Sequence, residues 1–305
     1  MNVRCGIAAA LLIVAAAAES QPVDVRTVAM FNQHLYYGSF SRPRGIAFDR
    51  EHNEVWVADS GNSLVGIYRP DSAELYAFGP GDRLREPARI TIAPEGHVVI
   101  IEGDRSHLRK FDYRGRYMGD VDLPGIGPKP ILGAAAYDSK GNLYVAENRS
   151  AQIFVYTRDG KLQQQFGSRG TDEGQFEAVC GIAIDSDKTI YVLDQRAIAV
   201  QAFDDQGNFL RGWGRHEMGS ENFSLPSGIA VDGRNHVIVT DELRHQVKIF
   251  STDGKFLTQF GGLGLDAGAL SFPTDVAVDG AGRIYVTERG TSRAQVFEIA
   301  VNPQR

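Results

Sequence analysis

A unit of about 47 residues recurs six times along the chain, and this repeat restricts the possible folds more than any other feature. The unit opens on an apolar run that ends in aspartate, as in Gly228-Ile229-Ala230-Val231-Asp232. Three further runs follow, separated by turns rich in Gly, Asp and Asn. Short runs of β-branched and aromatic residues between such turns predict four strands in each unit. The central residues of the opening runs are Ala47, Thr91, Ala136, Ala183, Ala230 and Ala277.

Four-stranded units of this length are typical of β-propeller blades, in which a ring of stacked sheets buries faces that a single sheet would expose. The sequence therefore predicts an all-β fold: a six-bladed β-propeller of four-stranded antiparallel blades. The sixth unit stops after its third run, near Glu298, and the segment 33–38 resembles a fourth run. We expect the N-terminal segment to supply the outer strand of the last blade, which would close the ring.

The first residues have the pattern of an export signal. Arg4 precedes an apolar run over 6–17, and Ala16-Ala17-Ala18 provides small residues at a cleavage site. The run is shorter than the roughly 20 residues that span a bilayer, although a membrane anchor is the alternative. We expect a signal peptide over 1–18, an N-terminal lead over 19–32, the propeller over 33–298 and a tail over 299–305. The mature chain would be periplasmic or extracellular, monomeric and without a membrane span.

The formal charge of −6 argues against nucleic acid as a partner, because affinity for nucleic acid depends on basic contacts. With the leader removed, Cys180 would be the only cysteine, so the core and the closure of the ring would have to stabilise the fold.

The repeat resembles that of the NHL-repeat family, which runs Pro-x-Gly-apolar-Ala-apolar-Asp, then Tyr-Val-Ala-Asp, then Phe-x-x-x-Gly. The segment from Pro226 to Gly261 matches this pattern almost throughout, and the unit with Arg89 and Ala93 departs most from it. The resemblance implies a six-bladed propeller, here in an exported, bacterial-type member. It does not imply one function, because members of the family include RNA-binding, protein-binding and lyase domains.

Each second run ends in a carboxylate, and the strand order places all six at one mouth of the central channel. They could form a ring of acceptors for a cation, such as a divalent metal ion, or for a cationic ligand. Alternatively, each could accept hydrogen bonds from its neighbouring loop, as a residue repeated in every blade would. We favour the second interpretation. The six residues are Asp59, Glu102, Glu147, Asp194, Asp241 and Glu288.

The residues that enter the first runs face the same mouth and differ from blade to blade, as the residues of a specific site would. Arg44 and Arg89 could grip one anionic group as bidentate donors, or could pair with nearby carboxylates. Cys180 could be a reactive thiol or a small buried side chain. The candidate ligand-binding residues are Arg44, Arg89, Cys180, Asp275, Arg149 and Arg196.

We therefore expect a binding module that takes a protein, peptide or glycan at the mouth, without a cofactor. The alternative is a metal-dependent propeller lyase or hydrolase with its site at the same mouth, similar to the peptidyl-hydroxyglycine amidating lyases or to lactonases. The amidating lyases bind zinc through histidines near the starts of first runs, and none of the six starts here is histidine.

Overall fold

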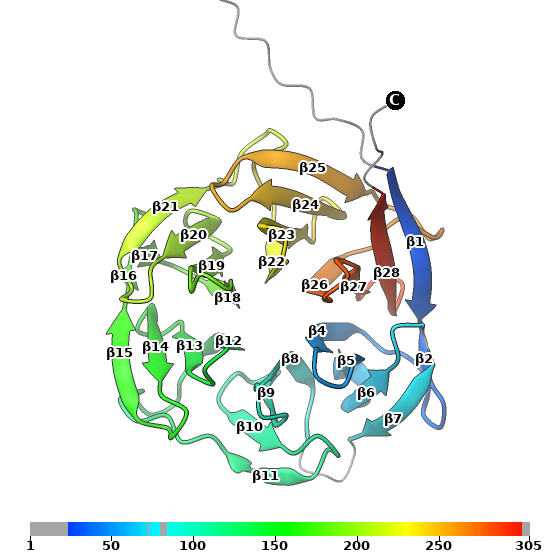
Figure 1. Ribbon diagram of the computed structural model, residues 1–305, viewed down its shortest axis with the longest axis horizontal. Helices are drawn as coiled ribbons and strands as arrows, with labels where there is room; N and C mark the ends of the chain where they lie inside the picture. The colour runs from blue at the N-terminus through cyan, green and yellow to red at the C-terminus, as the bar shows by residue number, and fades with distance from the viewer. Residues whose placement is uncertain (1–23, 72, 80–83, 301–305) are drawn as a thin grey trace, which may run out of the picture.

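The computed structural model describes residues 24–71, 73–79 and 84–300, and it shows six four-stranded antiparallel sheets around a central axis (Figure 1). The predicted six-bladed propeller is confirmed. The strands of each blade are listed from the axis to the rim: blade 1, β4 (Pro43–Asp49), β5 (Glu54–Asp59), β6 (Leu64–Tyr68), β7 (Glu74–Phe78); blade 2, β8 (Pro87–Ile92), β9 (Val98–Glu102), β10 (Leu108–Phe111), β11 (Tyr117–Asp120); blade 3, β12 (Leu132–Tyr137), β13 (Leu143–Glu147), β14 (Gln152–Tyr156), β15 (Leu162–Phe166); blade 4, β18 (Val179–Ile184), β19 (Ile190–Asp194), β20 (Val200–Phe203), β21 (Phe209–Trp213); blade 5, β22 (Pro226–Val231), β23 (His236–Asp241), β24 (Gln246–Ser251), β25 (Phe256–Gly261); and blade 6, β26 (Pro273–Val278), β27 (Ile284–Glu288), β28 (Arg293–Ala300), β1 (Asp24–Phe31).

The remaining elements are small. A hairpin of β2 (Gln33–His34) and β3 (Gly38–Ser39) follows β1, and β16 (Ser168–Arg169) pairs with β17 (Gln175–Phe176) between blades 3 and 4. The one helical element of the described ranges is a 3-10 turn, η1 (Ser60–Asn62). None of the described segments forms a helix with the length and apolar character needed to cross a membrane. The predicted signal peptide lies outside the described residues.

The ring closes through the N-terminal strand, as expected, but the strand lies upstream of the segment that the sequence suggested. β1 pairs antiparallel with β28, from Asp24 opposite Ala300 to Phe31 opposite Ala294. Arg26 adds an ion pair with Glu298 at 2.7 Å, and the Phe31 side chain is buried. The segment 33–38 instead turns back on itself as the β2–β3 hairpin.

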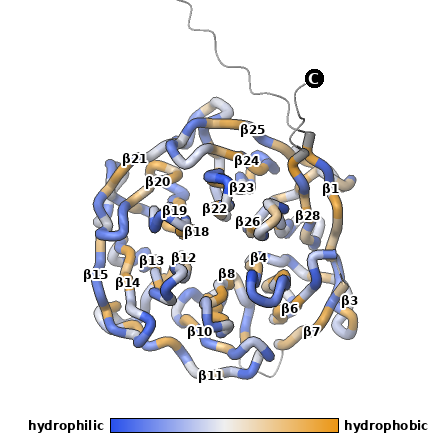
Figure 2. Tube along the Cα trace, viewed as in Figure 1, coloured by the Kyte–Doolittle hydropathy of each residue, from blue (hydrophilic) through white to orange (hydrophobic). Residues whose placement is uncertain are grey.

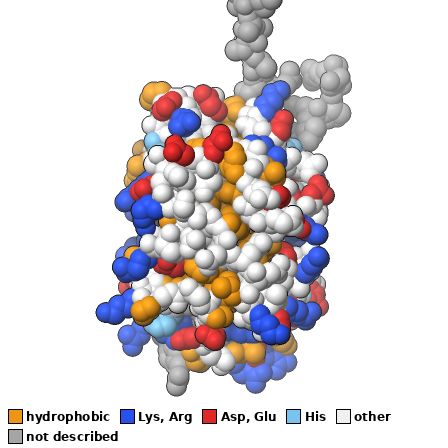
Figure 3. All heavy atoms as spheres, turned by 90° about the vertical axis from the view of Figure 1, so that its left-hand side faces the viewer, with side chains coloured by type: hydrophobic (Ala, Val, Ile, Leu, Met, Phe, Trp, Pro, Cys, Tyr) orange, Lys and Arg blue, Asp and Glu red, His pale blue; other side chains and the backbone are white. Residues whose placement is uncertain are grey.

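Apolar residues fill the spaces between blades, because both faces of each sheet are hydrophobic and each face packs against one neighbouring blade. Hydrophobic segments recur in every blade in Figure 2. One cluster joins Tyr191 of blade 4 to Val237 and Phe250 of blade 5, all fully buried. The outer surface of blades 3 and 4 carries scattered charges of both signs (Figure 3).

The first strands of neighbouring blades contact each other around the axis, and small residues permit this approach. A Cβ on Gly228 would lie 2.6 Å from Cα of Asp275, which is closer than any side chain allows. The central alanines are buried as the repeat predicted in four blades, whereas Ala47 is half-buried. The buried alanines are Ala136, Ala183, Ala230 and Ala277.

Candidate functional site

The six carboxylates that end the second strands are buried and hydrogen-bonded to the loops beside them. Asp194 accepts hydrogen bonds from the backbone amides of Glu177, Ala178, Arg196 and Ala197 at 2.8–3.1 Å. In every blade the carboxylate accepts a hydrogen bond from a backbone amide of the linker that leads into the same blade. The geometry fits the interpretation that these residues hold the frame of the ring.

The environment of Glu147 shows how strongly this arrangement favours the ionised carboxylate. Burial alone would raise the pKa of Glu147, yet its pKa lies below the ordinary value. The reason is that the amides of Ile131, Arg149 and Ser150 donate hydrogen bonds to its oxygens.

Within the described ranges, Glu102, Asp104 and His107 place potential metal-ligand atoms within 4.8 Å of one another. Glu102 already accepts hydrogen bonds from the amide of Arg85 and from Arg109 Nε, at 2.6 and 2.8 Å. The oxygens of Glu102 therefore serve the linker and a neighbouring guanidinium, and Asp104 and His107 lie on the exposed loop that follows.

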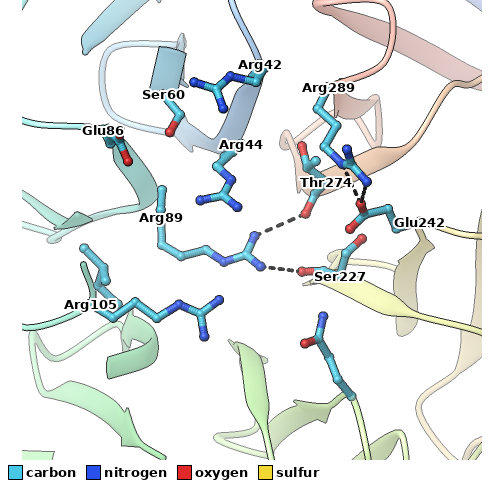
Figure 4. A pocket seen from close by; sticks show the side chains of 13 residues that line it. Arg42, Arg44, Ser60, Glu86, Arg89, Arg105, Ser227, Glu242, Thr274 and Arg289 are labelled. Carbon is cyan, nitrogen blue, oxygen red and sulfur yellow. Dashed lines mark hydrogen bonds and ion pairs between the residues drawn. The ribbon is translucent and has the colours of Figure 1, made fainter. Parts of the chain in front are cut away.

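The same mouth holds a cavity of about 450 Å³ whose lining is dominated by arginine (Figure 4). Five guanidinium groups face two carboxylates, although the chain as a whole is acidic. The lining residues are Arg42, Arg44, Ser60, Glu86, Ala88, Arg89, Ile101, Arg105, Gln195, Ser227, Glu242, Thr274 and Arg289.

Arg89 forms the floor of this cavity. From the first strand of blade 2 its guanidinium donates hydrogen bonds to the carbonyl oxygens of Ser227 at 2.8 Å and Thr274 at 3.2 Å, in blades 5 and 6 (Figure 4). Its Nη1 also lies 3.5 Å from Oδ2 of Asp275. Burial raises the pKa of Asp275 above the ordinary value, and the Arg89 charge opposes this rise. Arg89 therefore ties three blades together across the axis.

Arg44 and Arg105 point into the cavity toward Arg89, and neither side chain makes a hydrogen bond or ion pair with a described residue (Figure 4). Burial lowers the pKa of Arg44, and the charges of Arg89 and Arg105 lower it further. Burial and the Arg89 charge likewise lower the pKa of Arg105. The protein thus holds guanidinium groups close together without a protein anion between them.

The other charged residues of the mouth complete the lining. Arg289 forms an ion pair with Glu242 at 2.6 Å and stacks over the ring of Phe272, 4.6 Å from its centroid. Arg42 and Glu86 line the cavity from the blade 1 side (Figure 4). Planar guanidiniums with free N–H groups match the oxygens of a carboxylate or phosphate, so this arrangement can bind an anion.

The structure places Arg44 and Arg89 together at the cavity, with Asp275 beside Arg89, but three other candidate residues lie elsewhere. Arg149 is exposed and donates to the carbonyl of Lys129 at 3.2 Å, and Arg196 lines a separate depression. Cys180 is buried, and burial raises the pKa of its thiol to about 12, which suits a packed side chain rather than a reactive one.

Sequence reasoning missed five charged residues of the cavity. Arg42 and Arg289 stand one residue outside the repeat positions that had been considered, beside Pro43 and Glu288. Arg105 lies in the loop 103–107, and the loop 195–199 of blade 4 has the same length but places Arg196 outside the cavity. Loop length therefore gave no signal for Arg105. The missed residues are Arg42, Glu86, Arg105, Glu242 and Arg289.

Comparison with known proteins identifies the repeat. Residues 40–68, 223–250 and 270–297 match the model of the NHL repeat. Three segments, in blades 1, 5 and 6, thus match the NHL repeat. Protein brain tumor of Drosophila melanogaster is 23% identical over 137 residues, which cover 43% of this chain and 13% of that protein. The human E3 ubiquitin-protein ligase NHLRC1 is 30% identical over 138 residues, or 42% of this chain and 34% of that protein. The matches thus span about a third of one relative and about an eighth of the other.

Solved structures share the fold over most of the chain. A streptogramin B lyase superposes with a TM-score of 0.66 at 12% identity, covering 91% of this chain and 98% of that one. A protein of unknown function from Bacteroides thetaiotaomicron superposes with a TM-score of 0.67 at 16% identity, covering 92% and 76%. At identities this low, the superpositions establish the propeller architecture alone, and the function has to be argued from the site itself.

Proposed function

We propose that this protein is an exported binding module whose arginine-lined mouth receives an anionic group of a protein, peptide or glycan. The observation that supports the proposal is the pair Arg44 and Arg105, whose guanidiniums line the cavity without a partner among the described residues. Both residues are exposed at the mouth, and their guanidiniums form no ion pair with a described residue, so their N–H groups are available to a ligand of opposite charge.

The chemistry of the lining favours binding over catalysis. Its polar groups are five guanidiniums, hydroxyls and one amide, which donate hydrogen bonds to oxygen anions, and two carboxylates, of which Glu242 is paired with Arg289. The metal-dependent alternative depended on the six carboxylates, and each of these accepts hydrogen bonds from its own linker. Elemental analysis of protein purified without a histidine tag tests that alternative, because a stoichiometric divalent ion would support it.

The binding proposal is tested with arrays of acidic and neutral glycans and peptides, probed with the wild-type protein and two double variants. Arg44→Gln/Arg105→Gln removes the unpartnered guanidiniums of the cavity. Arg149→Gln/Arg196→Gln removes the same charge from the same end of the propeller but outside the cavity.

We expect acidic members of the arrays to bind wild type and the second variant but not the first, and binding to weaken as salt rises. Retained binding by the cavity variant would contradict the proposal. So would equal loss in the two variants, because the effect would then follow net charge rather than the cavity.

A further inference from the structure

The anionic group that enters the mouth can be specified further, on the basis of the proposed function. We infer that it carries at least two negative charges within a compact group, as a phosphomonoester or two neighbouring carboxylates do. A lone carboxylate would not satisfy the cavity.

The first step is the charge balance of the lining. Arg89 lies against Asp275, and Arg289 pairs with Glu242. Three lining cations remain without an ion pair to a described residue, namely Arg42, Arg44 and Arg105. Glu86 is the one lining carboxylate of the described residues that likewise forms no ion pair. The unpaired charges therefore amount to two positive charges in excess, and a dianion would neutralise them.

The second step is how the guanidiniums are aimed. Arg44 and Arg105 extend from blades 1 and 2 toward the Arg89 floor, so three guanidiniums from three chain segments approach one region (Figure 4). The guanidiniums repel one another, since the positive charge of Arg89 lowers the pKa of both Arg44 and Arg105. Arg44 and Arg105 each offer a planar fork of donors, whereas the terminal nitrogens of Arg89 already donate to Ser227 and Thr274. One edge of a carboxylate accepts one fork, so forks from two chain segments call for a group with more oxygens. A tetrahedral phosphate or a pair of carboxylates has enough oxygens to accept both forks.

The third step is size. Arg89, which crosses the axis to Ser227 and Thr274, is part of the cavity lining. The cavity volume of about 450 Å³ lies in the range of small-ligand sites, roughly 300–1,000 Å³. Ala88 and Ile101 are the two hydrophobic residues of the lining. The site thus fits the polar, charged end of a ligand, whatever carries that end.

The test uses three small anions as probes of the full chain: inorganic phosphate, malonate as a compact dicarboxylate, and acetate as its monoanionic control. Binding is measured by isothermal titration calorimetry at pH 7.5 and constant ionic strength. We expect phosphate, malonate or both to bind at one site, and acetate to bind at least about tenfold more weakly. The better of the two dianions distinguishes a phosphate ligand from a dicarboxylate ligand.

Arg44→Gln and Arg105→Gln should each weaken dianion binding by about tenfold or more, since each removes charge-assisted hydrogen bonds. Arg196→Gln, which removes one charge outside the cavity, should leave the affinity unchanged. Unchanged melting temperatures of the variants would show that the fold is intact, as expected for exposed side chains.

The outcomes separate this inference from the proposed function. Acetate binding as tightly as the dianions, through Arg44 and Arg105, would overturn the two-charge inference and leave the anion-binding mouth standing. The same holds if neither dianion binds while acidic array members require the two arginines. Dianion binding that is insensitive to both arginine variants would overturn both.

Discussion

Replacing Arg89 by Met should destabilise the ring, because the change leaves a buried carboxylate without its cation. The wild-type guanidinium makes two hydrogen bonds to carbonyl oxygens across the axis and lies 3.5 Å from Asp275. Removing one partner of a buried ion pair costs about 3–5 kcal/mol. The side chains of Arg89 and Asp275 keep 21% and 13% of their exposure, so solvent screens the charges in part and we expect a smaller cost, about 2–4 kcal/mol.

The loss of unfolding free energy caused by Arg89→Met should depend on pH. Burial raises the pKa of Asp275 above 3.8, and loss of Arg89 raises it further. A carboxyl group whose folded pKa exceeds its unfolded pKa contributes stability below the unfolded value and loses it as pH rises through the folded value. Arg89→Met should therefore be closer to wild type in unfolding free energy near pH 4.5 than at pH 7.5.

Urea denaturation of wild type, Arg89→Met, Asp275→Asn and the double variant measures this coupling. Asp275→Asn should cost little, since Arg89 keeps its two carbonyl acceptors. The double variant should be more stable than the sum of the single effects predicts, by about 1–3 kcal/mol. Additive effects, together with an Arg89→Met cost that is the same at both pH values, would refute the proposed pairing.

Three further predictions concern the frame. Deleting 1–31 removes β1 and exposes the edge of β28, so we expect aggregation or a lower melting temperature than for a 1–23 deletion, and an unchanged monomer would contradict closure. Ala230→Leu should cost about 1–3 kcal/mol by overpacking the contact between first strands, and a neutral denaturation curve would show that the site has room. Lys248 is fully buried, with its pKa lowered to about 8, and Gln201 and Gln295 take the same place in blades 4 and 6. A lysine whose pKa is lower in the folded than in the unfolded state makes the free energy of unfolding rise with pH between about 8 and 10.5. The free energy of unfolding of wild type should therefore increase relative to that of Lys248→Gln over this pH range. Parallel pH profiles of unfolding free energy for the two proteins would contradict the prediction.

The repeat made the architecture predictable, because the same pattern of strand and turn residues recurs in the sequence of each blade. The closing strand was harder. Asp24–Phe31 lacks the aromatic-glycine ending of the fourth runs of blades 1, 3, 4 and 5, whereas the segment 33–38 has a Tyr-Gly ending. The hairpin forms there because His34 is buried, with its Nε2 3.0 Å from Oδ2 of Asp59 and its Nδ1 2.9 Å from the Tyr68 hydroxyl. Those contacts join distant segments and leave no local pattern.

The site was predictable only where its residues occupy repeat positions. Arg44 and Arg89 stand on first strands, whose direction the repeat sets, so their meeting at the mouth followed from register. Arg105 is in a loop, where it adopts a φ of 57°. Arg149 and Arg196 occupy comparable loops and lie outside the cavity. Loop geometry, which depends on length and backbone angles, separated these cases.

The pairing of β1 with β28 also sets an order of events during synthesis. β1 is synthesised long before its partner, since Arg26 and Glu298 are 272 positions apart. Five blades can form from neighbouring segments in the meantime, but the sixth requires both β1 and β28. Contacts between such distant segments form slowly, because the long loop must close first. A nascent chain therefore carries an incomplete sheet edge that needs protection until β28 is available.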